Sequence, residues 1–514
     1  MSRGVVAAGH PVTADAARDT LAAGGNAFDA VLAAMVAACV AEPVLASLGG
    51  GGFLLAHPAG SEPEVFDFFV QTPRNQRPLE EIDFRPIVAD FGSAQQEFHI
   101  GLGTIATPGV VAGFFDIHGA LGTLPADVIA GPAIEAAREG VVVNGFQHYI
   151  ATIVAPILNS SPAALSLHAC ADHPGGLAAE GTRLTNPALA DTLETLCREG
   201  ARVFYSGEIG QSIAKACRED GGWLCEADLK GYRTVRRRPL CASFGEHRLF
   251  LNPPPSIGGT LLAFTLSLLD GQPATDPATD KGILAIADAM AATHRARRDH
   301  RIDFGVDEEL AQRMLAPDSM SRYRRAIAGA VSTRGTTHIS VADQAGNLAS
   351  LTLSNGEGSG FVAPGSGTML NNMLGEEDLN ARGFHQWPAD TRVSSMMSPT
   401  LAHSSDGDWY ALGSGGSNRI RSAILQTLLH LLAAGRSLDD AVHRPRVHVE
   451  NSHLSIEAGF PESAVAPLQE RFPEHHLWPT INLFFGGAHS VLRRADGSLD
   501  GAGDPRRGGV ARFV

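Results

Sequence analysis

The segment Thr336-Thr337-His338-Ile339-Ser340-Val341-Ala342-Asp343 decides how the rest of this sequence is interpreted. Ile339 and Val341 alternate with polar residues, and this two-residue period predicts a β-strand. The segment 344–347, Gln-Ala-Gly-Asn, has the composition of a turn, and a second strand-like segment, 348–354, follows it. The sequence therefore predicts a β-hairpin that begins at a threonine.

Thr336 can become reactive because of its place at the start of this hairpin. A threonine hydroxyl is a weak nucleophile unless a base activates it. If the bond between Gly335 and Thr336 is cut, the freed α-amine becomes that base, and the ordinary pKa of an α-amine, about 7.7–8.0, lies near neutral pH. A Thr-Thr pair at a strand start is otherwise explained by β-propensity alone. The remaining sequence has to decide between these two interpretations.

Composition and charge exclude several classes of protein. The chain has 514 residues, which favours two domain-sized units over one small core. A hydrophobic content of 44% and a charged content of 18% are typical of a globular protein. The net charge of -15 argues against nucleic acid as a partner and provides no attraction to anionic membranes. No HExxH or other metal-ligand spacing occurs, so we expect neither a metal nor a cofactor.

The compartment is predicted from segments and cysteines. The first residues contain no long apolar stretch of the signal-peptide type. The longest uncharged apolar run, 30–41, is too short to span a bilayer, so we expect no membrane partner. The six cysteines are far apart and lack CxxC spacing, which is typical of reduced thiols. These features predict a cytoplasmic protein.

Several local patterns predict individual elements. Thr13 is expected to cap a first helix, and Asn26 is expected to start a second, Ala-rich helix that ends near Ala41. This second helix is apolar nearly all round and is therefore expected to be buried. The three arginines at 236–238 are interpreted as a solvated edge.

Further motifs occur in a defined order along the chain. They are Leu48-Gly49-Gly50-Gly51-Gly52-Phe53, Pro108-Gly109, Asn252-Pro253-Pro254-Pro255, Leu370-Asn371-Asn372, Gly413-Ser414-Gly415-Gly416-Ser417 and Gly501-Ala502-Gly503-Asp504-Pro505-Arg506. Together with the hairpin, they resemble the gamma-glutamyltranspeptidase family of N-terminal-nucleophile hydrolases over residues 4 to 506. The resemblance implies an α+β fold, a four-layer αββα sandwich with helices outside two stacked sheets.

The resemblance also implies how the chain matures. Family members cut themselves before the nucleophilic threonine, which here is the bond between Gly335 and Thr336. Residues 1–335 would form a large subunit and residues 336–514 a small one, intertwined in one αββα unit. The partners implied are these two fragments as a heterodimer, or a dimer of such heterodimers, together with a small-molecule amide substrate.

The resemblance assigns catalytic roles to Ser354, Gly415 and Gly416 and a substrate-binding role to Asn355. Ser354 stands where the family has a threonine hydroxyl beside the nucleophile. Gly415 and Gly416 stand where backbone N–H groups form an oxyanion hole, and one such donor is worth roughly 3–4 kcal/mol of barrier. Without the other motifs, these glycines would indicate an ordinary helix-start turn. Asn355, or the glycine after it, is the expected substrate-contacting position.

The donor-binding elements depart from the family pattern at Phe69. The family has Asp-Phe-Arg-Glu at 67–70, and its arginine binds the α-carboxylate of the donor. A phenylalanine cannot replace a bidentate guanidinium. Either another cation, Arg74, Arg392 or Arg419, takes that role, or the substrate lacks this carboxylate. Phe69 packed in the core is compatible with both.

Two further donor contacts are also changed. The acids that bind the donor's amino group fall at Glu376, Glu377 and Asp378, where the spacing differs from the family. The family's serine pair falls on Ser395 and Met396 in an ungapped match, or on Ser394 and Ser395 after a shift of one residue.

Three hypotheses about function follow. The first is a self-processing threonine hydrolase that cleaves a γ-glutamyl, glutathione-like amide through an acyl-enzyme, with transfer to water or an amine. The second is an amidase or acylase for an amide that is not γ-glutamyl, because Phe69 replaces the arginine. The third is a catalytically silent binding or scaffold protein, for which a chain that never cleaves would be evidence. A serine hydrolase is disfavoured since no Gly-x-Ser-x-Gly motif occurs.

Overall fold

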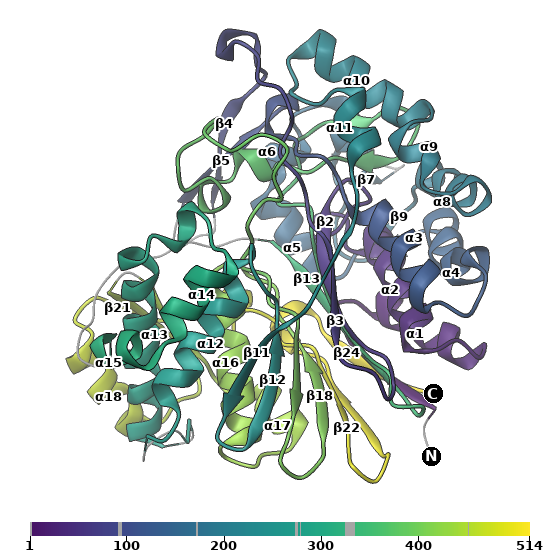
Figure 1. Cartoon of the computed structure of the whole chain (residues 1–514). Coiled ribbons are helices and arrows are strands. Elements are labelled where there is room, and N and C mark those ends of the chain that lie inside the picture. Colours follow the sequence, from purple (N-terminus) through teal and green to yellow (C-terminus); the bar gives the residue numbers. More distant parts are fainter. Residues whose placement is uncertain are drawn as a thin grey trace.

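The fold was analysed in a computed structural model of the whole chain. It describes residues 3–90, 95–170, 173–272, 276, 277, 279–323, 335–450 and 452–514. Two sheets lie face to face at the centre, and helices cover the outer face of each (Figure 1). The predicted αββα arrangement is confirmed.

The first sheet has seven antiparallel strands in the order β10-β3-β2-β14-β13-β1-β24. Their bounds are Gly4–Ala8 (β1), Gly51–His57 (β2), Glu64–Phe68 (β3), Val235–Arg237 (β10), Thr337–Asp343 (β13), Leu348–Ser354 (β14) and Val510–Phe513 (β24).

The second sheet has six antiparallel strands in the order β11-β12-β17-β18-β22-β23. Their bounds are Leu240–Phe244 (β11), His247–Leu251 (β12), Thr400–His403 (β17), Trp409–Leu412 (β18), Ser490–Arg493 (β22) and Leu499–Ala502 (β23).

Two groups of helices form the outer layers (Figure 1). The first sheet is covered by α1 (Pro11–Ala22), α2 (Ala27–Ala41), α3 (Val110–Leu121) and α4 (Ala126–Glu139). The second sheet is covered by α12 (Ile257–Leu269), α13 (Asp280–Asp299), α16 (Arg419–Leu432) and α17 (Leu438–His443).

Smaller elements surround this core. The helices are α5 (Gly145–Ile153), α6 (Ala155–Leu158), α7 (Pro162–Ser166), α8 (Pro187–Glu199), α9 (Arg202–Tyr205), α10 (Glu208–Asp220), α11 (Glu226–Gly231), α14 (Glu308–Leu315), α15 (Pro317–Tyr323) and α18 (Glu462–Arg471). The strands are β4 (Arg85–Asp90), β5 (Gln95–Ile100), β6 (Val141–Val142), β7 (Ala169–Cys170), β8 (His173–Leu177), β9 (Arg183–Leu184), β15 (Val362–Ala363), β16 (Thr368–Met369), β19 (Val447–Glu450), β20 (His453–Ile456) and β21 (His475–Leu477).

The predicted hairpin is confirmed as β13 and β14, two central strands of the first sheet. Both strands are buried along their whole length, so the polar residues that alternate along β13 face the second sheet rather than water. His338 is held there by Thr352 and Ser340, at 2.8 and 2.9 Å. The hydroxyl of Ser350 donates to Leu412 O of β18 at 2.9 Å. Paired polar groups therefore connect the two sheets at this point.

The first two helices confirm one predicted cap and correct the other. Asn26 caps α2, and its side chain accepts from the amides of Phe28 and Asp29. The predicted Thr13 cap is wrong, because α1 begins at Pro11 and His10 caps it. Proline suits the first helical position, since its missing N–H would have no partner there.

The three arginines at 236–238 are only partly a solvated edge. The strand β10 lies at the edge of its sheet. Arg237, however, binds the fully buried Asp67 at 2.9 Å, and Arg236 binds Glu64. In the register of β10 on β3, Arg236 lies opposite Phe66 and Arg237 opposite Val65, so each arginine reaches its acid diagonally across the two strands. Ion pairing across two strands therefore explains the arginine run better than solvation does.

Two findings bear on compartment. Within the described residues, no helix has both the length and the apolar character needed to cross a membrane. Five cysteines (39, 197, 217, 225 and 241) carry free thiols. The side chain of Cys170 lies outside what the structure describes.

Candidate active site

Thr336 lies at the start of β13, still joined to Gly335. Its hydroxyl donates to Gly335 O at 2.6 Å, and the residue is only 4% exposed. The pairing of β13 with β14 brings Ser354 alongside, and its hydroxyl donates to the same Gly335 O at 3.0 Å. Two hydroxyl groups therefore polarise the carbonyl of the bond at which cleavage is predicted.

The amide side of Gly335 is held by a residue that the sequence did not single out. Gly335 N donates to Glu357 Oε1 at 3.0 Å, and Glu357 is buried. Asn372 Oδ1 in turn accepts from Glu357 N at 3.0 Å. The one sequence signal for this role is an acid within a glycine-rich segment, 355–360, which by itself indicates only a polar turn.

Gly415 packs directly against Thr336. A Cβ added to it would lie 2.0 Å from Thr336 O, so only glycine allows this approach. Gly416 has a φ of +115°, another conformation that requires glycine. The hydroxyl of Ser414 donates to Gly415 O and accepts from Gly487 N, which holds the turn in place. Among the described residues, no acceptor is bonded to the N–H of Gly415 or Gly416, so both amides are available as donors.

A buried network of charged and hydroxyl groups contacts Thr336 and its neighbour Thr337. Arg507 Nη1 donates to Thr336 O at 3.1 Å. Glu42 accepts from the hydroxyls of Thr13 and Thr337 at 2.8 and 2.7 Å. Burial raises the pKa of the Glu42 carboxyl, while these hydroxyls and Arg507 act in the opposite direction. Burial lowers the pKa of Arg507 to about 10, so the guanidinium stays charged at neutral pH.

A small cavity opens beside Thr336. Its volume is about 30 Å³, room for roughly one water-sized group while Gly335 occupies one side. It is lined by Phe69, Gly335, Thr336, Ser354, Met373, Glu376, Asp378, Leu379, Ser395, Met396, Met397, Ser417 and Ile420. None of these described lining residues is a lysine, arginine or histidine. Apart from Phe69 and Met396, the apolar members were not predicted, because a methionine or leucine outside a known motif carries no local signal of a binding role.

Phe69 both lines this cavity and packs in the core. Its ring stacks on Phe53, with centroids 5.3 Å apart. Its carbonyl oxygen accepts from the Tyr232 hydroxyl at 2.7 Å and from Arg392. The position that the resemblance assigns to a carboxylate-binding arginine is therefore an apolar wall.

The three alternative cations do not reach the cavity. Arg392 is buried and pairs with Asp67 at 3.4 Å. Arg74 pairs with Asp390 at 3.2 Å and is 39% exposed at its side chain. Arg419 is buried over the ring of Phe484, and its Nε donates to the carbonyl oxygen there. The structure thus contains no replacement for the missing arginine among these three residues.

The structure places some of the predicted acids and serines at the cavity and others away from it. Glu376 and Asp378 line the cavity, whereas Glu377 is exposed and lies outside the lining. Ser395 lines the cavity and is followed there by Met396, which is the ungapped match.

Two other predicted contacts lie outside the lining. The hydroxyl of Ser394 donates to Pro255 O at 2.8 Å, away from the cavity. Asn355 is buried but also lies outside the lining.

Comparison with known proteins identifies similar chains. The family model for Gamma-glutamyltranspeptidase matches residues 13–514. The chain is 30% identical over 522 residues to the Acylase ACY 1 proenzyme of Pseudomonas sp. (strain V22), covering 98% of this chain and 92% of the relative. It is 27% identical over 550 residues to the Glutathione hydrolase proenzyme of Escherichia coli (strain K12), covering 98% and 90%.

Among solved structures, the crystal structure of cephalosporin acylase from Bacillus halodurans matches with a TM-score of 0.83. The match has 22% sequence identity and covers 99% of this chain and 96% of that one. At this identity the likeness concerns the fold, and it agrees with the two stacked sheets described above.

Proposed function

We propose that this chain, which belongs to the gamma-glutamyltranspeptidase family, is a self-processing threonine acylase for an amide whose acyl group lacks the α-carboxylate of a γ-glutamyl donor. The family consists of N-terminal-nucleophile hydrolases and transferases, so the chain is an enzyme. The substrate, the nucleophile and the cleavage site are the parts of this statement that experiments must test.

The proposed maturation step starts from the bonds around Gly335. Thr336 Oγ1 attacks the Gly335 carbonyl carbon, the C–N bond breaks, and an ester replaces the peptide bond. The breaking C–N bond takes up the hydroxyl proton and frees the α-amine of Thr336, and water then hydrolyses the ester to the Gly335 carboxylate and the Thr336 hydroxyl. The hydroxyl of Ser354, which donates to Gly335 O at 3.0 Å, supports this proposal because it withdraws electrons from the carbonyl under attack.

The two fragments are expected to remain together after cleavage. β13 and β14 come from residues 336–514, but β13 pairs with β1, and β14 pairs with β2. Separation would break these strand pairings and expose both sheet faces. A stable heterodimer of residues 1–335 and 336–514 is therefore proposed.

In the proposed turnover, the α-amine of Thr336 accepts the proton of its own hydroxyl, and Oγ1 attacks the substrate carbonyl. The amides of Gly415 and Gly416 stabilise the oxyanion. The substrate amine takes the proton and leaves, and water or another amine then releases the acyl group from Thr336. Arg507 holds the Thr336 carbonyl during these steps, which keeps the nucleophile in position.

One observation carries the proposed substrate class: the described lining of the Thr336 cavity has two carboxylates and no cation. A donor carboxylate placed there would lose its hydration without gaining a charged partner, which is costly. An ammonium group or an uncharged acyl chain meets no such penalty. We therefore favour acyl groups that are neutral or carry an amine over γ-glutamyl.

Two experiments test this proposal. Intact mass measured on the purified protein and on Thr336→Ala should show two fragments that meet at Gly335/Thr336 in the former, and one full-length chain in the latter. The p-nitroanilides of γ-glutamic, 4-aminobutyric, glutaric and butyric acid then separate the contributions of the two charges, because they differ only in the amine and the carboxylate. We expect the 4-aminobutyryl and butyryl compounds to be cleaved faster than the γ-glutamyl and glutaryl compounds, which carry a carboxylate.

The outcomes against the proposal are distinct. Faster cleavage of the γ-glutamyl compound would return the chain to the glutathione-like hypothesis. A chain that stays uncut and cleaves none of the four compounds would support a silent binding protein.

A further inference from the structure

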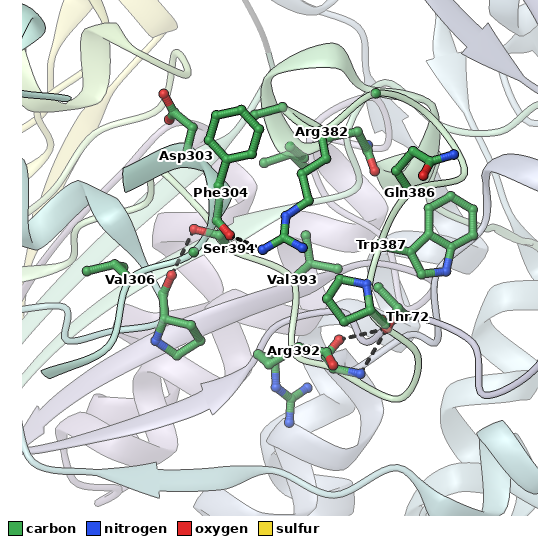
Figure 2. A pocket seen from close by; sticks show the side chains of 18 residues that line it. Thr72, Asp303, Phe304, Val306, Arg382, Gln386, Trp387, Arg392, Val393 and Ser394 are labelled. Carbon is green, nitrogen blue, oxygen red and sulfur yellow. Dashed lines mark hydrogen bonds between the residues drawn. The ribbon is translucent and has the colours of Figure 1, made fainter. Parts of the chain in front are cut away.

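A second, larger cavity lies next to the one at Thr336. Its volume is about 270 Å³, against about 30 Å³ beside the nucleophile. Figure 2 shows its side chains, with Phe304 and Trp387 on opposite sides and Val393 below the Arg382 side chain that extends between them. These apolar groups make up much of the wall, so the cavity suits an apolar body of some length.

The two cavities share walls. Leu379 lines both of them. Two paired segments also run from one to the other, since Val393 N donates to Val70 O at 3.1 Å and Thr72 N donates to Thr391 O at 2.9 Å. At one end of this pair lie Phe69 and Ser395 in the Thr336 cavity, and at the other end lies the larger cavity. The larger cavity is therefore the next one along these segments from Phe69, with Leu379 between the two.

The larger cavity holds one uncompensated charge among its described lining residues. Asp303 is neutralised by Arg297, whose Nε donates to both of its oxygens at 2.8 and 3.0 Å. Arg392 is paired with Asp67. Arg382 donates to the carbonyl oxygen of Phe304 and has no carboxylate partner within the described part of the chain (Figure 2). Arg382 is an exposed residue, and a guanidinium that retains free donors at the wall of an apolar cavity is suited to bind an anion.

We propose that the larger cavity is the distal acyl subsite, which binds a long acyl group with an apolar body and a terminal carboxylate that contacts Arg382. This inference rests on the proposed threonine acylase function and specifies its substrate. We expect the glutaryl group to be too short for this contact, because the small cavity at Thr336, which is lined by Glu376 and Asp378, comes before the larger one. In a longer diacid, the methylene chain lies in the small cavity beside the two acids, and the terminal carboxylate lies in the larger cavity.

The test compares three p-nitroanilides: butyryl, octanoyl and 7-carboxyheptanoyl. We expect octanoyl to exceed butyryl in kcat/KM roughly tenfold, because more apolar surface is buried. We expect 7-carboxyheptanoyl to exceed octanoyl by about fivefold to tenfold because of Arg382. Arg382→Gln should abolish the second ratio. Arg198→Gln, an exposed change on α8 with a side chain 67% exposed, is the matched control and should leave both ratios unchanged.

A second variant tests the cavity without removing the charge. Ala381 is exposed and lines the cavity, so Ala381→Trp should fill the space without disturbing the core. The advantage of octanoyl over butyryl should then fall at least fivefold. An octanoyl preference that survives Ala381→Trp, or a 7-carboxyheptanoyl preference that survives Arg382→Gln, would overturn the proposal.

A binding measurement separates this inference from the acylase proposal. The probe is 8-oxo-9-phenylnonanoic acid, a ketone analogue of octanedioic acid monoanilide that has no amide bond to cleave. The readout is quenching of Trp387, with Trp387→Phe to identify the signal. Binding should be at least fivefold weaker in Arg382→Gln. If binding follows Arg382 but no anilide is cleaved, the subsite stands and the acylase proposal fails. Equal binding by both proteins would refute the subsite even in an active enzyme.

Discussion

The nucleophile side and the substrate wall of this site are built in different ways. The nucleophile side comprises β13, β14 and the turn 413–417, where regular pairing and buried hydrogen bonds hold each group. The substrate wall comprises residues 69–72 and 376–397, which are largely irregular and border both cavities. A strand ladder holds reacting atoms in place, whereas loops accept new side chains at low cost. The difference suggests that reaction chemistry and substrate choice can change independently.

The largest effect is expected from Thr336→Ala, which removes the proposed nucleophile. The variant should remain one chain, and turnover should fall by roughly 10⁴-fold or more. Intact mass and initial rates measure this, and an unchanged unfolding temperature would exclude misfolding. Thr336→Ser keeps a hydroxyl and serves as the control. Normal cleavage of the alanine variant would remove Thr336 from the mechanism.

Gly415→Ala should be the next largest change on the nucleophile side. Its added Cβ would lie 2.0 Å from Thr336 O, so the nucleophile's backbone has to move. A displacement of this kind costs about 100-fold in rate. Gly119→Ala in α3 is the matched control, because no atom lies within 4 Å of its added Cβ. Equal rates for both variants would show that the close approach at Gly415 is not needed.

Low pH should weaken the nucleophile side through His489, whose carbonyl accepts from Ser340. Burial lowers the pKa of His489 from 6.5 to about 4, and its Nδ1 accepts from Asp504 N at 3.1 Å. The folded state favours the neutral ring. The contribution of this ring to the free energy of unfolding is therefore complete above pH 6.5 and is lost as the pH falls toward 4. The loss at pH 5 is about 2 kcal/mol.

The measurement is the free energy of unfolding between pH 7 and pH 5. His489→Gln should flatten this dependence by about 2 kcal/mol. The comparison variant is His385→Gln in the substrate wall, where the pKa is lowered by burial but the ring is only half-buried. It should flatten the dependence less. A larger flattening in His385→Gln than in His489→Gln would contradict the contrast between the nucleophile side and the substrate wall.

The smallest effect is expected from Glu376→Gln in the substrate wall. Loss of one carboxylate should reduce the preference for 4-aminobutyryl over butyryl p-nitroanilide by about fivefold, with little change in the butyryl rate. Glu377→Gln is the control, because Glu377 is exposed and outside the cavity lining. Equal preferences in the two variants would mean that Glu376 does not contact the amine.

Local sequence patterns predicted the elements with regular periods. The bounds of β14 agree with the expected segment 348–354, and Asn26 begins α2 as its capping pattern indicated. The resemblance to a known family supplied the sandwich architecture, which periodicity alone does not contain. Thr13 failed as a cap because a buried partner, Glu42, outweighed its local preference for a helix start.

Contacts between distant segments could not be predicted in this way. Glu357 bonds Gly335 across a strand end, and Arg382 reaches Phe304 from 78 residues away. The choice of Ser395 rather than Ser394 depends on which way each side chain faces in an irregular segment. Irregular segments have no fixed period, so adjacent residues cannot be assigned to a face from sequence.

The sequence by itself determined the hairpin, the threonine that begins it and the family to which both belong, because strand alternation and short motifs are local properties. Only the tertiary structure decided what surrounds that threonine. It paired Arg392 with Asp67 and left Arg382 without an acidic partner among the described residues. The charge that a substrate meets depends on which partners the fold brings within bonding distance, and that distance is not encoded locally.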